Sequence, residues 1–83
     1  MRYWFDVRNG NGLTLDEEGQ IALDADAARK IAISSIRSII GEEVAVGRLD
    51  LRGAIDVRCE DDNTRFTVEF AAAFDVLLPT EGQ

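Results

Sequence analysis

Apolar and polar side chains alternate along the first residues of the chain. Apolar residues fill the odd-numbered positions Tyr3, Phe5 and Val7, and between them lie Arg2, Trp4, Asp6 and Arg8. A period of two is typical of a strand with one buried face, so residues 2–8 predict a strand.

A turn and a polar loop follow this strand. The run Asn9-Gly10-Asn11-Gly12 accepts positive φ at low cost, which predicts a tight turn into a short returning strand at residues 13–15. Residues 16–20 are polar and predict a loop. Residues 21–23 predict a few more extended residues.

The next pattern has the period of a helix. Asp24 is a good N-cap residue, because its carboxylate accepts hydrogen bonds from the first free amides of a helix. Apolar or small residues then recur on one face, at Ala28, Ile31, Ala32, Ser35, Ile36, Ile39 and Ile40. Gly41 costs about 1 kcal/mol in a helix interior and offers one possible end. We expect the helix to continue to Ala45 or Val46, because Val44 extends the apolar stripe and Gly47 is a better-placed terminator.

Residues 54–60 and 65–70 predict a closing hairpin. An alignment that puts the apolar side chains on one face pairs Cys59 with Phe66, Val57 with Val68, Ile55 with Phe70, Glu60 with Arg65, Arg58 with Thr67 and Asp56 with Glu69. The last pair places like charges opposite each other, which costs stability. The turn is then centred on Asp62-Asn63. Residues 71–78 fit either a helical turn or a bend into a last short strand, and residues 79–83 a frayed tail.

One amphipathic helix and several half-buried strands predict a two-layer α+β domain. We expect the order β(β)αββ, with an antiparallel sheet of three or four strands and the long helix packed on one face. A chain of 83 residues is the size of one domain, here residues 1–78.

The composition narrows the possible functions. Nine basic and sixteen acidic residues give a net charge of −7, which repels phosphate backbones and argues against nucleic acid as a partner. No apolar run reaches the roughly 20 residues of a membrane span, and the first residues lack a signal-peptide layout. We therefore expect a cytoplasmic protein with no membrane partner. The lone Cys59, followed by three acidic residues, fits a small buried strand residue better than a nucleophile.

Residues 7–18 partly resemble a calcium-binding loop. If Gly12 takes the place of the obligatory glycine, Asn9 and Asn11 fall at ligand positions and Glu18 at the twelfth position. Val7 then stands where the loop needs Asp, and the preceding segment reads as a strand where the loop needs a helix. The turn is the better interpretation, and we predict no metal ion and no cofactor.

The adjacent acids Asp16, Glu17 and Glu18 raise the question of carboxylate catalysis. Such catalysis needs two carboxylates in different environments that converge in a pocket. Three acids in one exposed loop lack that contrast, and a solvated contact loop is the better interpretation. The chain also has no histidine, the commonest general base. We expect no enzyme.

Trp4 is the strongest candidate for a binding residue. If Tyr3, Phe5 and Val7 face the helix, Trp4 lies on the opposite face of the sheet, where an exposed tryptophan can anchor a partner. Its neighbours there would be some of Asp56, Arg58, Thr67 and Glu69. The better interpretation is that Trp4 lies over the methylenes of its neighbours, or that Phe74 and Leu77 fold back to cover it, because scattered apolar groups on a protein surface are normal.

The pattern of Phe5-Asp6, Gly10, Gly12, Asp16, Glu18-Gly19, Ala27-Ala28, Leu49 and Phe70 resembles a family of small bacterial proteins known only as a domain of unknown function. The resemblance covers nearly the whole chain and implies no activity. A fainter similarity is to HicB-type antitoxin domains, which open near Met-Arg-Tyr and enter a helix with alanines near its start. Their Pro-Asp-Leu-Pro-Gly-Cys segment is missing here.

Three functions follow from these observations. The first is a non-catalytic protein-interaction module that binds a protein partner or a second copy of itself. Its contact surface includes Trp4, Asp56, Arg58, Thr67, Glu69 and the acidic loop. The second is an antitoxin-like partner that masks a small basic protein, steered by the negative charge. The third, a small metal-dependent enzyme, has the least support.

Overall fold

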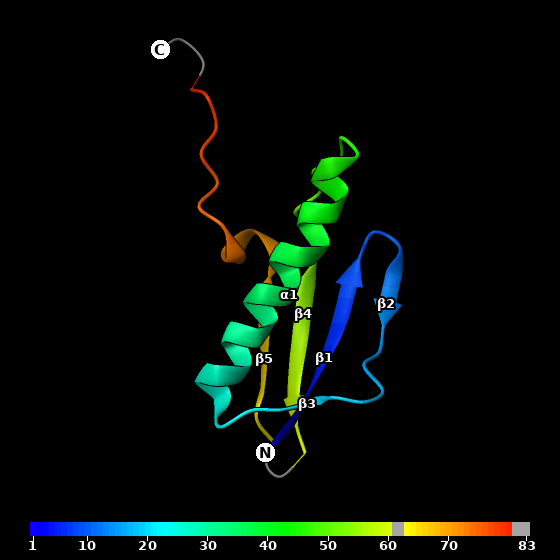
Figure 1. The fold of residues 1–83 in the computed structure, drawn as a ribbon, viewed down its shortest axis with the longest axis vertical. Coiled ribbons are helices and arrows are strands. Elements are labelled where there is room, and N and C mark those ends of the chain that lie inside the picture. The colour runs from blue at the N-terminus through cyan, green and yellow to red at the C-terminus, as the bar shows by residue number, and fades with distance from the viewer. Residues whose placement is uncertain (61–62, 81–83) are drawn as a thin grey trace.

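The computed structural model describes residues 1–60 and 63–80, and it has the predicted α+β architecture (Figure 1). The elements in chain order are β1 (Arg2–Asn9), β2 (Gly12–Thr14), β3 (Gln20–Ile21), α1 (Ala25–Ala45), β4 (Ala54–Cys59), β5 (Arg65–Glu69) and the 3-10 helix η1 (Phe70–Ala73). All strand pairs are antiparallel, in the order β2-β1-β4-β5, and β3 also pairs with β1. The sheet therefore gains β3 as a short fifth strand, and α1 covers one of its faces.

Helix α1 begins and ends where its sequence predicts. The Asp24 carboxylate accepts a hydrogen bond of 2.8 Å from the backbone N–H of Ala27, which caps the first turn. At the other end, the N–H of Arg48 donates to Glu43 O (2.9 Å) and the N–H of Gly47 to Val44 O (3.0 Å). These two bonds form a Schellman motif, which needs a left-handed residue that Gly47 supplies with φ +88°. The helix runs through Gly41 without ending there.

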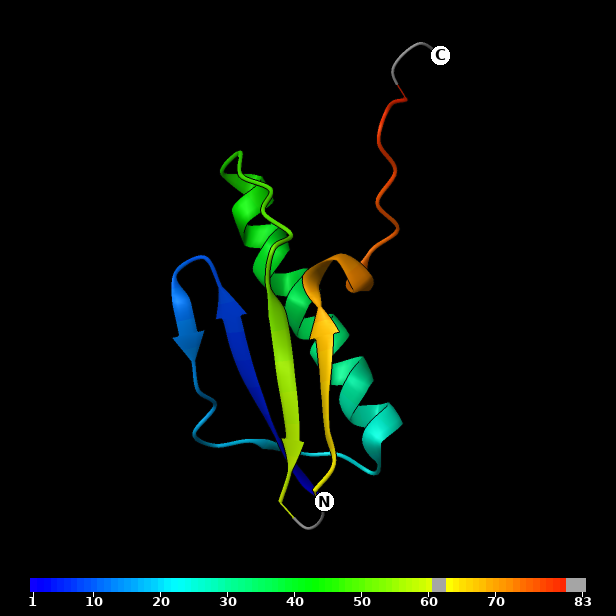
Figure 2. The same ribbon diagram turned by 180° about the vertical axis from the view of Figure 1, so that it is seen from behind.

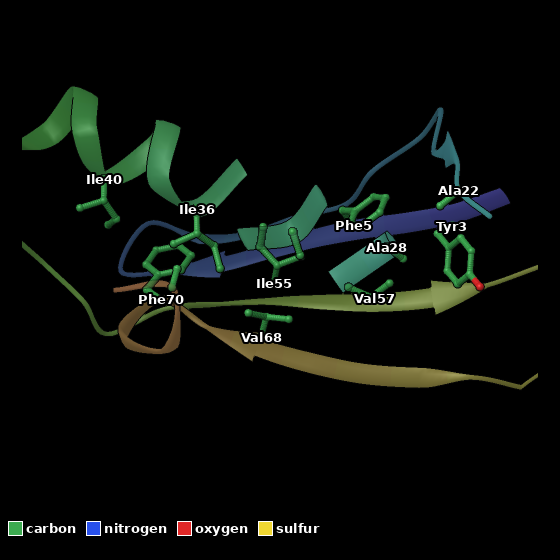
Figure 3. Close-up of a cluster of buried hydrophobic side chains, with 12 residues drawn as sticks. Tyr3, Phe5, Ala22, Ala28, Ile36, Ile40, Ile55, Val57, Val68 and Phe70 are labelled. Carbon is green, nitrogen blue, oxygen red and sulfur yellow. The ribbon is translucent and has the colours of Figure 1, made fainter. Parts of the chain in front are cut away.

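The core lies between α1 and the sheet (Figure 3). The fully buried helix residues are Ala28, Ala32, Ile36 and Ile40, spaced four apart along one stripe. They pack against buried side chains of the sheet and η1, which are Tyr3, Phe5, Ile55, Val57, Val68 and Phe70. Ala28 lies beside Phe5, and Ile36 and Ile40 lie near Phe70 at the other end of the sheet.

The hairpin register differs by two residues from the prediction. Val57 pairs with Phe66 and Ile55 with Val68, so Phe70 lies beyond the strand and begins η1. A shift of two keeps every side chain on its predicted face, so the apolar alternation does not distinguish the two registers. The predicted like-charge pair Asp56–Glu69 is therefore wrong.

Side-chain contacts favour the observed register. Asp56 lies opposite Thr67, whose hydroxyl donates to the Asp56 carboxylate at 2.7 Å. Phe70, only 2% exposed, packs into the core, and its backbone N–H donates to Gly53 O at 2.9 Å. The predicted turn centre at Asp62 lies outside the described residues.

The segment after β5 takes the helical alternative. Residues 70–73 form η1, and Ala73 O accepts a hydrogen bond of 2.9 Å from Arg37 Nε of α1. After Phe74 the chain continues without regular structure (Figure 2). The predicted frayed tail falls partly outside the described residues, which end at position 80. Within the described ranges, no helix combines the length and apolar character that a membrane span requires.

The glycines at the end of α1 provide a test of the helix boundary. Gly41 lies inside the helix with open space around the position of a Cβ atom, so Gly41→Ala should raise the free energy of unfolding by about 0.5–1 kcal/mol. Gly47→Ala is the control and should lower it, because φ is +88° there. Urea denaturation measures both. The opposite ranking of the two variants would mean that the helix ends at Gly41.

Candidate functional site

The face of the sheet that points away from α1 is polar. We call it the polar face; it carries Trp4, Asp6 and Arg8 of β1, Asp56 and Arg58 of β4, and Arg65, Thr67 and Glu69 of β5. Alternation along each strand places these side chains on one side, opposite the core. Five of the eight predicted contact residues are therefore brought together here (Trp4, Asp56, Arg58, Thr67 and Glu69), while Asp16, Glu17 and Glu18 lie in the loop beside β1.

Two crossed ion pairs organise the centre of the polar face. Asp6 and Asp56 are direct cross-strand neighbours and would repel each other. Each is neutralised by an arginine diagonal to it on the opposite strand. Arg58 Nε lies 3.0 Å from Asp6 Oδ2, and Arg8 Nε lies 2.7 Å from Asp56 Oδ2. The second nitrogens of both guanidinium groups also bond, at 3.4 Å and 3.1 Å, so both contacts are bidentate.

Trp4 is covered by its cross-strand neighbour. The guanidinium carbon of Arg58 lies 5.0 Å from the centre of the Trp4 ring, within range of a cation–π contact. Trp4 is half-buried. The interpretation that its own neighbours cover it thus describes the structure better than the exposed anchor does. Leu77 plays no part in the covering, because it is 89% exposed, and Phe74 packs against the core.

Asp16 joins the loop after β2 to the edge of β1. Its carboxylate accepts hydrogen bonds from the backbone N–H groups of Phe5 (3.0 Å), Gly19 (3.0 Å) and Glu18 (3.2 Å). Its own N–H donates to Asp6 Oδ1 at 2.8 Å. The loop thus bonds to β1 between the segments that pair with β2 and with β3.

Gly19 allows this close approach. It has φ +71°, and a Cβ atom there would lie 2.8 Å from Tyr3 O and 3.2 Å from Trp4 Nε1. The contact with the backbone oxygen of Tyr3 is too short for a Cβ atom, and the positive φ is unfavourable for other residues, so the loop needs glycine at this position.

These contacts shift the acidity of two carboxyl groups. Partial burial alone would raise the pKa of Asp16, but the three backbone hydrogen bonds and the nearby Arg58 outweigh it, so this pKa lies below its usual value. The hydrogen bond from Arg8, followed by that from Thr67, holds the pKa of Asp56 below its usual value. Both groups are therefore charged at neutral pH and are held by fixed donors.

This arrangement offers little for acid–base chemistry. Asp6, Asp16 and Asp56 are each occupied by arginine or backbone donors, and the pKa values of Asp16 and Asp56 are lowered, not raised toward neutrality. A shallow hollow of about 290 Å³ is present on this face, lined in part by Leu13, Leu15 and Arg65. The acidic loop itself does not converge, since Glu17 and Glu18 are exposed while Asp16 turns inward.

The residues of the calcium-loop pattern lie in a hairpin. Val7 belongs to β1 and pairs with Thr14, and the Asn9 side chain accepts from the N–H of Asn11 at 2.8 Å. Within residues 1–60 and 63–80, no group of three or more Asp, Glu, Cys or His side chains is arranged to hold a metal ion. Cys59 lies in β4, half-buried, with its Sγ 3.7 Å from Met1 Sδ.

A second surface was missed by the sequence analysis. We call it the apolar end; it consists of the exposed Val44, Leu49, Val76, Leu77 and Leu78. These residues line a groove of about 300 Å³ together with Ile40, Leu51, Phe74 and Asp75. The signal was present in the sequence as the run Val76-Leu77-Leu78, which follows the last predicted strand and has no place in the predicted core.

Comparison with known proteins agrees with the resemblance to an uncharacterised family. Residues 2–71 match the model of a family described as Domain of unknown function (DUF6894). The chain belongs to this family. No curated protein and no solved structure matches it. The DUF6894 match covers β1 to β5, α1 and the start of η1, so the polar face lies within the family domain and Val76–Leu78 follow it.

The role of Asp16 can be tested by truncation. Asp16→Ala should lower the free energy of unfolding by about 2 kcal/mol, because it leaves the partly buried N–H of Phe5 without an acceptor. Glu17→Ala is the matched control in the same exposed loop and should change it by less than about 0.5 kcal/mol. Equal effects in urea denaturation would contradict the structural role of Asp16.

The same pair predicts a pH dependence. Since the folded pKa of Asp16 is lowered, its contribution is complete above the unfolded value of about 3.9 and is lost as the pH falls through the folded value. The stability difference between the wild type and Asp16→Ala should be constant above about pH 5 and should narrow below about pH 4. Denaturation curves at several pH values measure it. A difference that persists unchanged at pH 2 would contradict the assignment.

Proposed function

We propose that this chain is a non-catalytic protein-interaction module that binds its partner through the apolar end. The observation that carries this proposal is the distribution of exposed apolar side chains. Leu77 is 89% exposed, Leu78 75%, Leu49 63% and Val44 52%, and all four line one groove. A cluster of large exposed apolar residues around a groove is typical of a protein-contact surface.

The polar face supports the same proposal by contrast. Its charged side chains bond to one another across β1 and β4, so a ligand there would compete with bidentate ion pairs already made. At the apolar end a partner has no existing ion pair to displace. Covering this surface removes apolar area from water, which is favourable by about 25 cal/mol per Å². Binding at the apolar end is therefore the less costly of the two.

The charge of the chain indicates the chemistry of the partner. The net charge is −7, and Asp75 lies in the lining of the groove. A partner that offers an apolar side chain flanked by basic residues would complement both features. The antitoxin-like alternative, in which the partner is a small basic protein, is a special case of this interaction and rests on the same negative charge.

A photo-crosslinking residue placed at Leu77 tests the proposal in cells. We expect a discrete adduct with one protein, identified by mass spectrometry, because Leu77 lines the groove and is 89% exposed. The matched control is the same residue at Leu23, which is 87% exposed but lies before α1, away from the groove. It should give no such adduct.

The outcomes separate the alternatives. A small basic protein in the Leu77 adduct would favour the antitoxin-like function, and a partner without basic character would favour the general module. Equal labelling at Leu77 and Leu23, or no adduct at Leu77, would contradict binding through the apolar end.

A further inference from the structure

Strand β5 presents an open strand edge that ends where η1 begins. It is the last strand in the order β2-β1-β4-β5, so within the described residues no strand pairs with its outer side (Figure 2). The other exposed edges are shorter, since β2 has three residues and β3 two, whereas β5 has five. An open edge of this length is a template for pairing with another strand.

The hydrogen bonds of the hairpin identify which backbone groups face outward. The N–H of Cys59 donates to Thr64 O (3.1 Å), and the N–H of Phe70 donates to Gly53 O (2.9 Å). Bonded pairs alternate in an antiparallel ladder, so residues 64, 66, 68 and 70 bond toward β4. The N–H and C=O groups of Arg65 and Thr67 and the N–H of Glu69 therefore point to the open edge, whereas the C=O of Glu69 accepts the first hydrogen bond of η1.

The side chains at these three positions are complementary to the same side chains of a second, antiparallel copy. Arg65 is positive, Glu69 is negative, and Thr67 lies halfway between them. Natural edge strands are protected by proline, bulges or charged side chains. β5 has no proline, and its two charges are of opposite sign. Two copies of this strand that meet in antiparallel orientation can place opposite charges face to face.

We propose that two copies of the chain associate through β5, in antiparallel orientation about a two-fold axis at Thr67. Arg65 then lies opposite Glu69 of the second copy, and Thr67 lies opposite Thr67. The outward N–H groups of Thr67 and Glu69 and the carbonyls of Thr67 and Arg65 form about four backbone hydrogen bonds across the axis. The two sheets become one continuous sheet. On the helix side, Phe66 meets Val68 of the second copy.

The charges select this register from its neighbours. An axis at Arg65 or at Glu69 places identical charges opposite each other, which is unfavourable. An axis at Phe66 or at Val68 leaves Arg65 and Glu69 without an oppositely charged residue across the interface. Only the axis at Thr67 forms both charge pairs, so the pairing is isologous and closes as a dimer.

Charge reversal tests the register. Arg65→Glu alone and Glu69→Arg alone each create two like-charge pairs and should weaken dimerisation at least tenfold, measured by sedimentation equilibrium. The double variant Arg65→Glu with Glu69→Arg restores opposite charges across the axis and should recover wild-type dimerisation. Within one chain the two residues are about 13 Å apart along the strand, so recovery cannot come from an intrachain pair.

Proline tests the backbone bonds. Glu69 has φ −74°, which proline adopts without strain, and its N–H points outward. Glu69→Pro should therefore keep the urea midpoint within error of the wild type and abolish dimerisation. Glu69→Gln keeps the backbone donor and should weaken dimerisation less. Circular dichroism verifies that each variant is folded. If Glu69→Pro fails to fold, the charge-reversal variants still test whether the chain dimerises through β5.

Three results would overturn the proposal. They are a wild-type chain that stays monomeric at millimolar concentration, single reversals that dimerise as the wild type does, and a double variant that stays as weak as the single ones. None of these experiments involves the apolar end. Failure of the Leu77 crosslink would therefore leave the β5 dimer intact, and failure of the β5 dimer would leave the proposed function intact.

Discussion

The hydrogen bond from the backbone N–H of Phe5 to the carboxylate of Asp16 is the contact on which the outer half of the sheet depends. β1 pairs with β2 at one end and with β3 at the other, and the chain between them has to cross a gap along the edge of β1. In this gap the carboxylate of Asp16 accepts the hydrogen bond that a neighbouring strand would otherwise accept. The same carboxylate folds the loop back through Glu18 and Gly19, so one aspartate fixes both the edge and the path that leads to α1.

The main elements follow from local rules, which is why the sequence alone predicts them. Asp24 begins the helix, Gly47 ends it, and the period of two in residues 2–8 fixes which face of β1 is buried. The alternation also places Asp6 and Arg8 beside Trp4, although their crossed pairing with Arg58 and Asp56 depends on strand order, which no local pattern contains. The inward turn of Asp16 was missed for the same reason, because its partner Phe5 lies eleven residues away in another strand.

The hairpin register shows a different limit of prediction from sequence. A shift of two residues preserves the apolar face, so the choice rests on contacts that appear only in three dimensions. Phe70 settles it by packing into the core as the first residue of η1, where Gly53 accepts its N–H. Phe70, which the sequence pattern places at the end of a strand, begins η1 and packs into the core between the sheet and α1. The apolar end escaped prediction because nothing in the run after Phe70 distinguishes an exposed apolar segment from one that folds back.

The length of α1 has a consequence for how this fold can be extended. A helix of 21 residues is about 31 Å long, whereas the six residues of β4 span about 20 Å. The last turns of the helix therefore project past the end of the strands, as Figure 1 shows. The apolar stripe of α1 continues beyond the sheet, so its last residue Val44 has no strand to pack against and is exposed. Sequence changes in this overhang are free of the constraints of the core, so the projecting end can diversify while the domain beneath it stays the same.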